Sequence, residues 1–183
     1  MSDYVTILEA AEFAAHRHRD QRRKGKSKRP YVGHCIEVAS ILASIGKVED
    51  PNVIIAALLH DTVEDTETSR EEIRDKFGQA AADLVTEVTD DKSLKKKERK
   101  ALQIEHAPTL SSGAKLIKVA DKISNVREIA HDPPKKWSRN RRWEYFEWAE
   151  QVINAMGPID PEMRLVFDKT VADARALLDE TDE

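Results

Sequence analysis

Three patterns that would place this sequence in a broad class of protein are missing. The 183 residues contain one cysteine, Cys35, so neither an internal disulfide nor a Cys-x-x-Cys zinc knuckle can form. No apolar run approaches the roughly 20 residues that cross a bilayer. The amphipathic start, MSDYVTILEAAEFAA, carries acids where a signal peptide would carry positive charge. We therefore expect a cytoplasmic protein without membrane association.

An excess of positive charge is also missing. The 30 lysines and arginines face 34 aspartates and glutamates, for a net charge of −4, whereas general nucleic-acid binders are usually strongly basic. We therefore do not expect nucleic acid as a partner. Long Gly/Ser linkers, low-complexity tracts and internal repeats are absent too. The length suits one well-packed core, so residues 1–183 are expected to form a single domain, whose oligomeric state the sequence does not define.

Apolar residues recur at helical spacing along most of the chain, and alternating strand-like runs are absent. This pattern predicts an all-α fold, a compact helical bundle. Several helix ends have local signals. Asp50 can cap a helix that begins at Pro51. Ser69 and Glu72 fit a capping box, and Gly78 can end that helix. The expected helices span residues 4–19, 34–45, 51–60, 69–76, 79–89, 96–105, 111–130, 138–156 and 161–179.

One expected helix is apolar on every side and ends in titratable residues. Residues 53–59, VIIAALL, leave no solvent face, so the helix should lie centrally, and its end at His60 and Asp61 should be buried. Without partners, these two side chains would lose hydration at a cost of several kcal/mol. A hydrogen-bonded structural pair would compensate them. A metal ion would do so as well, because it neutralises the carboxylate and takes the imidazole lone pair.

Two further polar residues stand at the margins of apolar helix faces. His34 lies where a loop enters a helix, in PYVGHCIEVASIL, and Asp121 lies in AKLIKVADKISNVREI. Asn125 shares the helix face of Asp121. Spacing alone favours a pair between Asp121 and a neighbouring lysine, Lys118 or Lys122, on a wet surface. The remaining histidines are expected to be ordinary surface residues: His16, His18, His106 and His131.

Together these residues resemble a known pattern. His34, the pair His60–Asp61 and Asp121 resemble the H…HD…D motif of the HD phosphohydrolase superfamily. Flanking blocks in order make the chain similar to the small alarmone hydrolases, the hydrolase-only relatives of the RelA/SpoT enzymes, and to their metazoan type in particular. The blocks are QRRKGKSKRPYVGH, AALLHDTVEDTETS, VTDDKSLKKKERKALQIEHAP, AKLIKVADKISNVR and EYFEWAEQV. The resemblance is strongest over residues 5–156, and residues 157–183 are expected to carry a C-terminal helix.

The resemblance implies an all-α, metal-dependent enzyme. Family members remove the 3′-pyrophosphate of guanosine tetra- or pentaphosphate (ppGpp, pppGpp), alarmones of the stringent response, and release GDP or GTP and pyrophosphate. By resemblance, Glu64 and Asp65 orient or deprotonate the attacking water. From the residues alone, both acids could equally be solvated loop residues or help to start the next helix. The resemblance implies Mn²⁺, with another divalent metal as alternative, held by His34, His60, Asp61 and Asp121.

A strongly basic stretch, residues 17–29, holds eight lysines or arginines in 13 residues. By itself such a run predicts a solvated surface, with a nuclear-localisation or RNA-binding tract as a competing reading. The resemblance implies instead that Arg23 and Lys24 neutralise nucleotide phosphates. It assigns further substrate contacts to Lys96, Asn125 and Tyr145. For Tyr145, a place among the core aromatics fits the spacing equally well.

Two positions depart from the family pattern. Cys35 follows His34 where relatives usually have proline, and Ser124 stands where they often carry a larger residue. Substrate preference is the implication most exposed to these changes. The leading hypothesis is hydrolysis of ppGpp or pppGpp. Two alternatives stay open: a phosphatase acting on another nucleotide, such as the 2′-phosphate of NADPH, and a nucleotide or RNA sensor without turnover.

Overall fold

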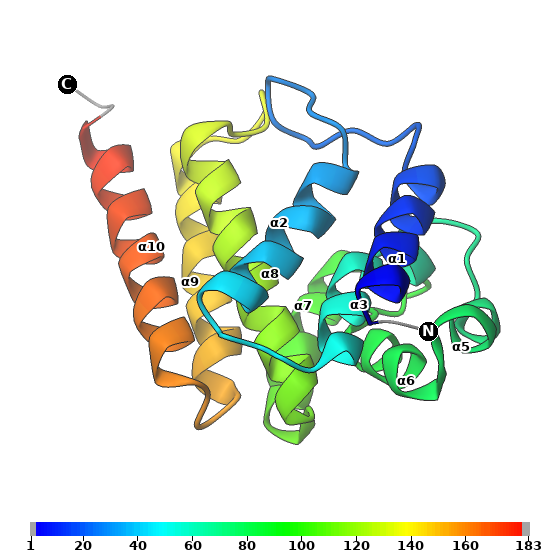
Figure 1. Cartoon of the computed structure of the whole chain (residues 1–183). Coiled ribbons are helices and arrows are strands. Elements are labelled where there is room, and N and C mark those ends of the chain that lie inside the picture. Colours follow the sequence, from blue (N-terminus) through cyan, green and yellow to red (C-terminus); the bar gives the residue numbers. More distant parts are fainter. Residues whose placement is uncertain (1–2, 181–183) are drawn as a thin grey trace.

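The computed structural model describes residues 3–180, and the predicted all-α fold is confirmed (Figure 1). Within these residues no strand forms, and the only extended pairing is an isolated bridge between Arg22 and Pro30. The α-helices are α1 (Asp3–Arg17), α2 (Val32–Ser44), α3 (Pro51–Leu59), α4 (Thr62–Asp65), α5 (Arg70–Phe77), α6 (Gln79–Val88), α7 (Lys96–His106), α8 (Ser112–His131), α9 (Arg139–Ala155) and α10 (Pro161–Glu180). A 3₁₀ turn, η1 (Ala107–Thr109), follows α7.

Each helix expected from apolar spacing is present, with ends displaced by a few residues. The structure adds α4, which begins directly after Asp61 and ends with Glu64 and Asp65. A helix of 4 residues makes about one turn, so its sequence contains no repeat that could reveal it. The two acids are therefore helical residues and not part of an open loop.

The local signals at helix ends act largely as expected. The Asp50 side chain accepts a hydrogen bond from the Asn52 backbone N–H, ahead of the helix that starts at Pro51. Gly78 ends α5 with a φ of 91°, in the region that favours glycine. The capping box is half formed. Ser69 accepts from the Glu72 N–H, but the Glu72 carboxylate pairs with Arg17 of α1 and ties α5 to that helix.

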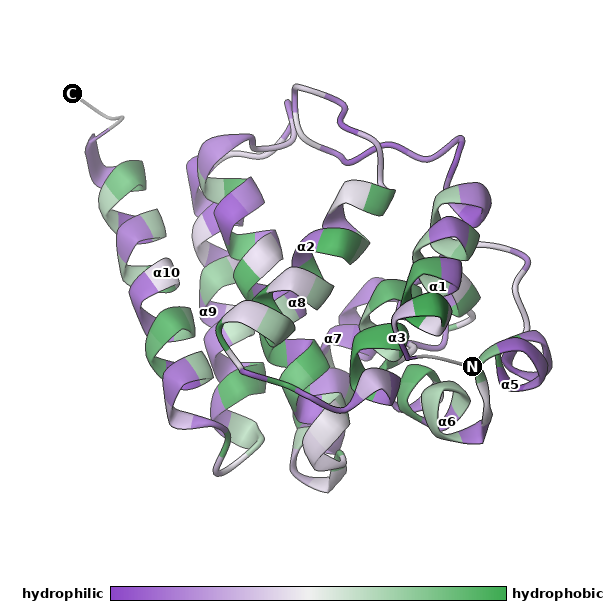
Figure 2. Ribbon diagram, in the orientation of Figure 1, coloured by the Kyte–Doolittle hydropathy of each residue, from purple (hydrophilic) through white to green (hydrophobic). Residues whose placement is uncertain are grey.

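Helix α3 lies in the centre of the molecule. Residues 53–59 are each at most 9% exposed, and α1, α2, α6 and α8 pack around them. Figure 2 shows α3 coloured largely as hydrophobic, with apolar and polar stretches alternating on the helices around it. Burying each valine, isoleucine or leucine side chain stabilises the fold by about 1.5–3 kcal/mol, so α3 is among the most firmly held helices. Its C-terminal end, where His60 and Asp61 stand, is fixed accordingly.

Helix α8 passes through the same core and contacts α2, α3, α6, α9 and α10. The expected C-terminal helix is α10, which packs along α8 and α9 through residues such as Phe167 and Leu178 (Figure 1). Residues 1–2 and 181–183 lie outside the described part. Among residues 3–180, no helix has the combination of length and apolar character that crossing a bilayer requires.

Candidate functional site

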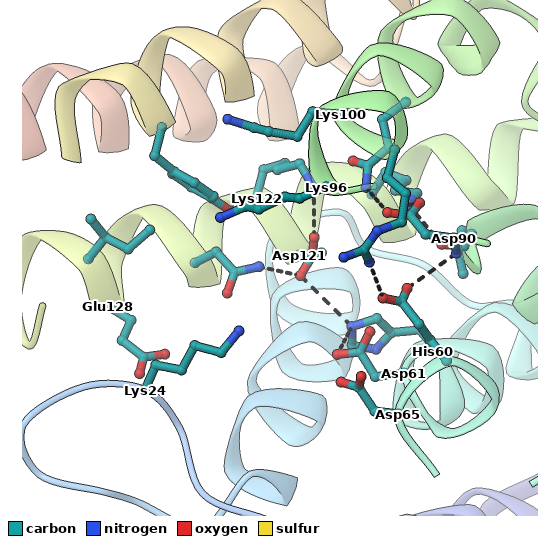
Figure 3. A pocket seen from close by; sticks show the side chains of 18 of the residues that line it. Lys24, His60, Asp61, Asp65, Asp90, Lys96, Lys100, Asp121, Lys122 and Glu128 are labelled. Carbon is teal, nitrogen blue, oxygen red and sulfur yellow. Dashed lines mark hydrogen bonds and ion pairs between the residues drawn. The ribbon is translucent and has the colours of Figure 1, made fainter. Parts of the chain in front are cut away.

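Three helices bring the predicted metal ligands together. His34 lies in the first turn of α2. His60 and Asp61 join α3 to α4, and Asp121 lies in the middle of α8 (Figure 3). The four side chains meet with their donor atoms turned toward one another. The distances are 3.2 Å from His34 Nε2 to Asp121 Oδ1, 3.1 Å from His60 Nε2 to Asp61 Oδ2, 3.7 Å from His34 Nε2 to Asp61 Oδ2 and 3.8 Å from His60 Nε2 to Asp121 Oδ1.

The two imidazoles present the same ring atom to this meeting point. His34 Nδ1 lies 2.9 Å from Ser124 Oγ, and His60 Nδ1 donates to the Ala57 carbonyl at 2.7 Å. Both Nε2 atoms are buried and have no hydrogen-bond partner among the described residues. A buried lone pair without a partner is costly, whereas a cation between two such nitrogens and two carboxylates satisfies all of them. The donor set therefore fits a divalent metal ion.

The pKa values of the histidines reflect the negative charge of this site. Burial by itself would lower the pKa of His60, but Asp61 and Asp121 outweigh it and raise the pKa to about 9. His34 behaves oppositely: burial lowers its pKa, and Arg23 and His60 lower it further, against the effect of Asp121. The carboxylates that would hold a proton on His60 are the same groups that would attract a cation.

Neighbouring side chains fix the orientation of both carboxylates. Tyr31 donates its hydroxyl to Asp61 Oδ2 at 2.6 Å. Burial, followed by Asp61, raises the pKa of Tyr31, so this hydroxyl stays protonated and remains a donor. Asn125 Nδ2 donates to Asp121 Oδ1 at 2.6 Å. The oxygens that face the histidines are therefore held in place from outside the ligand set.

For the alternative that Asp121 pairs with a lysine on a wet surface, the structure shows the pairing but not the wet surface. Lys122 does pair with Asp121 Oδ2 at 3.0 Å, but Lys122 is 2% exposed and its Nζ lies 4.7 Å from the centre of the Trp148 ring. Lys118 turns away and donates to the Val88 carbonyl at 2.7 Å. The error arose because spacing on one helix gives the face of a residue and not what covers that face.

Glu64 and Asp65 stand beside the ligands at the end of α4. The Glu64 carboxylate accepts from Arg99 Nη1 and from the Asp90 backbone N–H, each at 3.2 Å. Burial, then Asp90 and Asp61, raise the pKa of Glu64. Asp65 forms an ion pair with Lys92. Glu64 is thus held with a raised proton affinity, as a general base requires.

A cavity of about 440 Å³ opens over these acids. Every site residue expected from the sequence lines it except His34, which reaches the ligand cluster from beneath and is 3% exposed. The cavity has two walls of different chemistry (Figure 3). We call the side formed by His60, Asp61, Asp121, Glu64 and Asp65, with His34 behind it, the acidic wall. The opposite side, the cationic wall, includes Lys24, Lys96, Lys100, Tyr145 and Trp148.

Arg23 and Lys24, which are neighbours in the loop before α2, take different places. Arg23 is largely buried, forms an ion pair with Glu128 and donates to Asn125 Oδ1 at 2.8 Å. Its charge is therefore already balanced within the protein. Lys24 is exposed and lines the cavity, where Figure 3 shows its side chain reaching toward the acids. Of the two, Lys24 holds the charge that a ligand can reach.

Lys96 and Tyr145 belong to a group of cations and aromatic rings. Lys96 Nζ lies 5.6 Å from the centre of the Trp137 ring, and the Tyr145 ring lies 6.0 Å from Trp137 and 5.3 Å from Trp148. Burial lowers the pKa of Lys96, and the nearby cations, Arg141 first, lower it further. Tyr145 is half-buried and lines the cavity, so it both packs on the core and faces a ligand.

Several cavity residues were not expected from the sequence. Arg99 and Asp90 hold Glu64, and Gln103 donates to Asp90 Oδ2 at 2.6 Å. These residues lie on other helices or loops, so no local spacing connects them to Glu64. The expectation of a surface His18 is also wrong. His18 is 1% exposed and packs 4.9 Å from the Tyr31 ring, because the chain folds back over it.

The two departures from the family pattern are both buried. Cys35 is a free thiol with 0% exposure, and burial raises its pKa well above the usual value, with Asp61 adding to the effect. This environment favours an inert thiol. Ser124 contacts the candidate ligand His34 directly, so it lies behind the candidate metal site and not on the open cavity.

Comparison with known proteins gives consistent matches. The HD domain family matches residues 10–145. Two similar relatives carry the name guanosine-3′,5′-bis(diphosphate) 3′-pyrophosphohydrolase MESH1. The protein from Xenopus tropicalis is 53% identical and that from Homo sapiens 52% identical, each over 155 residues that cover 85% of this chain and 87% of the relative. The solved structure of a metazoan ortholog of SpoT that hydrolyzes ppGpp matches with a TM-score of 0.90 and 44% identity, covering 94% of this chain and 96% of that chain.

Proposed function

This chain belongs to the HD domain family, and from that membership we propose that it removes the 3′-pyrophosphate of ppGpp or pppGpp to give GDP or GTP and pyrophosphate. The names of its relatives support this reaction. The observation that carries the proposal is the ligand cluster itself, with two bare Nε2 atoms between two carboxylates at the floor of a cation-lined cavity. We propose residues 1–183 as one domain acting in the cytoplasm.

We propose that a divalent metal, with Mn²⁺ as first expectation, is held by His34, His60, Asp61 and Asp121. Imidazole and carboxylate ligands suit manganese and also admit zinc or iron. When bound, such an ion would lower the pKa of a coordinated water and polarise a phosphoryl oxygen. The protein's contribution is a fixed ligand frame, since Tyr31 and Asn125 orient the carboxylates.

Glu64 and Asp65 are assigned to the attacking water. A water oxygen forms a bond to the phosphorus attached to O3′ and the P–O3′ bond breaks. The 3′ oxygen of GDP or GTP leaves and takes up a proton from solvent, and the attacked group is released as pyrophosphate. Glu64 accepts the proton of the water, because its raised pKa makes the carboxylate a stronger base than an exposed glutamate. Arg99 and the Asp90 N–H keep that carboxylate aimed into the cavity. Asp65 orients the water and is itself oriented by Lys92.

The cationic wall is assigned to the phosphates and the base. Burial first, then the charges of Arg141 and Lys24, lower the pKa of Lys96, and a polyphosphate bound among these cations relieves their repulsion. Tyr145 offers a ring face to the nucleobase. Asn125 offers its side-chain amide to the nucleotide. Arg23 does not bind the phosphates directly but holds Glu128 and Asn125 in position at the floor of the cavity.

The test is hydrolysis of ppGpp by the purified protein, with products separated by ion-exchange chromatography. Manganese should give GDP and pyrophosphate in equal amounts, a chelator should abolish turnover, and manganese should restore it. Full activity in protein that elemental analysis shows to be metal-free would overturn the mechanism. Release of orthophosphate in place of pyrophosphate would overturn the assigned bond cleavage.

A second substrate, NADPH, deserves the same assay. Tyr31 lines the cavity beside Asp61, and three further aromatic residues, Trp137, Tyr145 and Trp148, line it together with the lysines, which is more stacking surface than one guanine requires. Phosphate release from NADPH with a higher kcat/KM than pyrophosphate release from ppGpp would assign the 2′-phosphatase function. Nucleotide binding without turnover of either compound would support the sensor alternative.

A further inference from the structure

The imidazole of His34 is contacted at both ring nitrogens by one helix, α8. Asp121 Oδ1 lies 3.2 Å from Nε2, and Ser124 Oγ lies 2.9 Å from Nδ1. Asp121 and Ser124 are three residues apart and therefore share a helix face. Helix α8 thus supplies a carboxylate to the metal-facing side of the ring and a hydroxyl to the other side.

The direction of the hydrogen bonds follows from their chemistry. A serine hydroxyl has one hydrogen, and Ser124 donates it to Glu37 Oε2 at 2.8 Å. Ser124 Oγ must then accept from His34, so the hydrogen of the neutral imidazole is on Nδ1 and the Nε2 lone pair is free. Glu37 lies one turn after His34 on α2. The chain of bonds therefore runs from His34 through Ser124 to Glu37.

The competing tautomer of His34 has a ready partner. With its hydrogen on Nε2, the ring could donate to Asp121 Oδ1 at the existing distance of 3.2 Å, and it could then no longer bind a metal through Nε2. Ser124 stabilises the other tautomer, with the hydrogen on Nδ1, because its hydroxyl oxygen accepts a hydrogen bond from Nδ1–H. Because Ser124 is 1% exposed, bulk water has no access to replace its hydroxyl.

His60 does not share this dependence. Its Nδ1–H donates to the backbone carbonyl of Ala57, in its own helix, at 2.7 Å. No side-chain substitution removes that acceptor. Of the two imidazoles, only His34 has its tautomer set by side chains, which makes it the ligand whose metal affinity can be altered without touching the ligand itself.

We propose that Ser124 and Glu37 are positioning residues that lock His34 in the tautomer able to bind the metal through Nε2. The proposal rests on the metal site of the proposed function and not on the identity of the nucleotide. Loss of a hydrogen-bond partner behind a ligating histidine lowers metal affinity by about 10–100-fold. Ser124→Ala should fall in this range.

The experiment uses metal-stripped, full-length protein without substrate, so its outcome does not depend on which nucleotide is hydrolysed. Calorimetry gives the Kd for Mn²⁺, and ¹⁵N NMR of the histidine rings gives the His34 tautomer. Ser124→Ala should weaken Mn²⁺ binding by about 10–100-fold and move the His34 hydrogen toward Nε2. The control is Ser44→Ala on α2, an exposed serine whose hydroxyl donates to Ser40 O and which should leave both readouts unchanged.

Glu37 provides a second variant pair if Ser124→Ala does not fold. Its side chain is 39% exposed, so substitution there spares the core. Glu37→Gln keeps an acceptor and should bind Mn²⁺ nearly as wild type does, whereas Glu37→Leu should weaken binding by an intermediate factor. A wild-type Kd and tautomer in Glu37→Leu would overturn the role of Glu37. A weaker Kd in Ser124→Ala with an unchanged His34 tautomer would reduce Ser124 to a packing residue and overturn the proposal.

Discussion

The acidic and cationic walls of the cavity are made from different kinds of structural support. His34 and His60 are 3% and 5% exposed, and they project from helices packed in the core together with Asp121. Lys24 comes from a loop, and Lys96 comes from α7, a helix in which no residue from Lys96 to His106 is buried. The ligand side of the first wall is therefore held rigidly by the core, whereas Lys24 and Lys96 of the second wall are long side chains in contact with solvent.

This difference separates two kinds of function. Charges in a buried frame interact strongly, because little water screens them, and they cannot reorient without disturbing the core. Exposed lysines attract anions from solution, but salt weakens this attraction. Each lysine side chain also has several rotamers. Substitutions in the acidic wall should accordingly change metal content and kcat. Those in the cationic wall should change KM and the dependence on salt.

Asp121→Asn should produce the largest effect. It removes a charged ligand from the centre of the acidic wall, so metal occupancy and rate should fall together. Loss of several kcal/mol of metal-derived stabilisation corresponds to a decrease on the order of a thousandfold in kcat. Metal content by elemental analysis and kcat are measured beside the exposed control Asp75→Asn. Retention of bound metal with normal kcat would remove Asp121 from the ligand set.

Glu64→Gln and Asp65→Asn should separate chemistry from binding within the same wall. Both should keep the metal and the nucleotide, and at least one should lose about a hundredfold or more in kcat, the usual contribution of a general base. Metal content, nucleotide affinity and kcat are compared with Glu67→Gln, an exposed neighbour. Near-normal kcat in both variants would leave the two acids without a catalytic role.

Lys24→Glu tests the cationic wall. We expect KM to rise by at least about tenfold, equivalent to about 1.4 kcal/mol, with a smaller change in kcat. The remaining activity should fall less with added salt, because screening now weakens a repulsion. Steady-state kinetics over a range of salt concentrations are compared with Lys169→Glu on the exposed face of α10. An unchanged KM would favour the interpretation that the basic stretch, residues 17–29, is a solvated surface without a role in substrate binding.

The smallest expected effect concerns stability. The pKa of Glu64 is raised in the folded state, so its stabilising contribution is present at low pH and is lost as pH rises through the folded pKa. Glu64→Gln should therefore raise Tm at pH 7 by no more than about a few degrees. The gain should shrink as pH falls below the wild-type pKa. Thermal denaturation with chelator present, across pH, checks this, and a Tm gain that grows toward acid would contradict it.

Much of the fold could be predicted from local sequence. The seven apolar residues of VIIAALL required a central helix, because no arrangement with a wet face could hold them. The same argument predicted that His60, at the end of that helix, is buried and needs a partner that offsets its lost hydration. Asp50 and Gly78 marked helix ends through their own side-chain and backbone preferences. Such signals depend on neighbours within about one helical turn, which a sequence displays directly.

The sequence by itself thus determined the helices other than α4, the central position of α3 and the residue types at the candidate metal site. Only the tertiary structure decided which side chains support that site. Lys122 is covered by Trp148 of α9, Ser124 contacts His34 of α2, and Arg99 of α7 holds Glu64 of α4. His18 is buried because the chain folds over it. The physical reason is that burial and hydrogen-bond partners arise where helices cross, and the periodicity of a single helix does not specify the crossing.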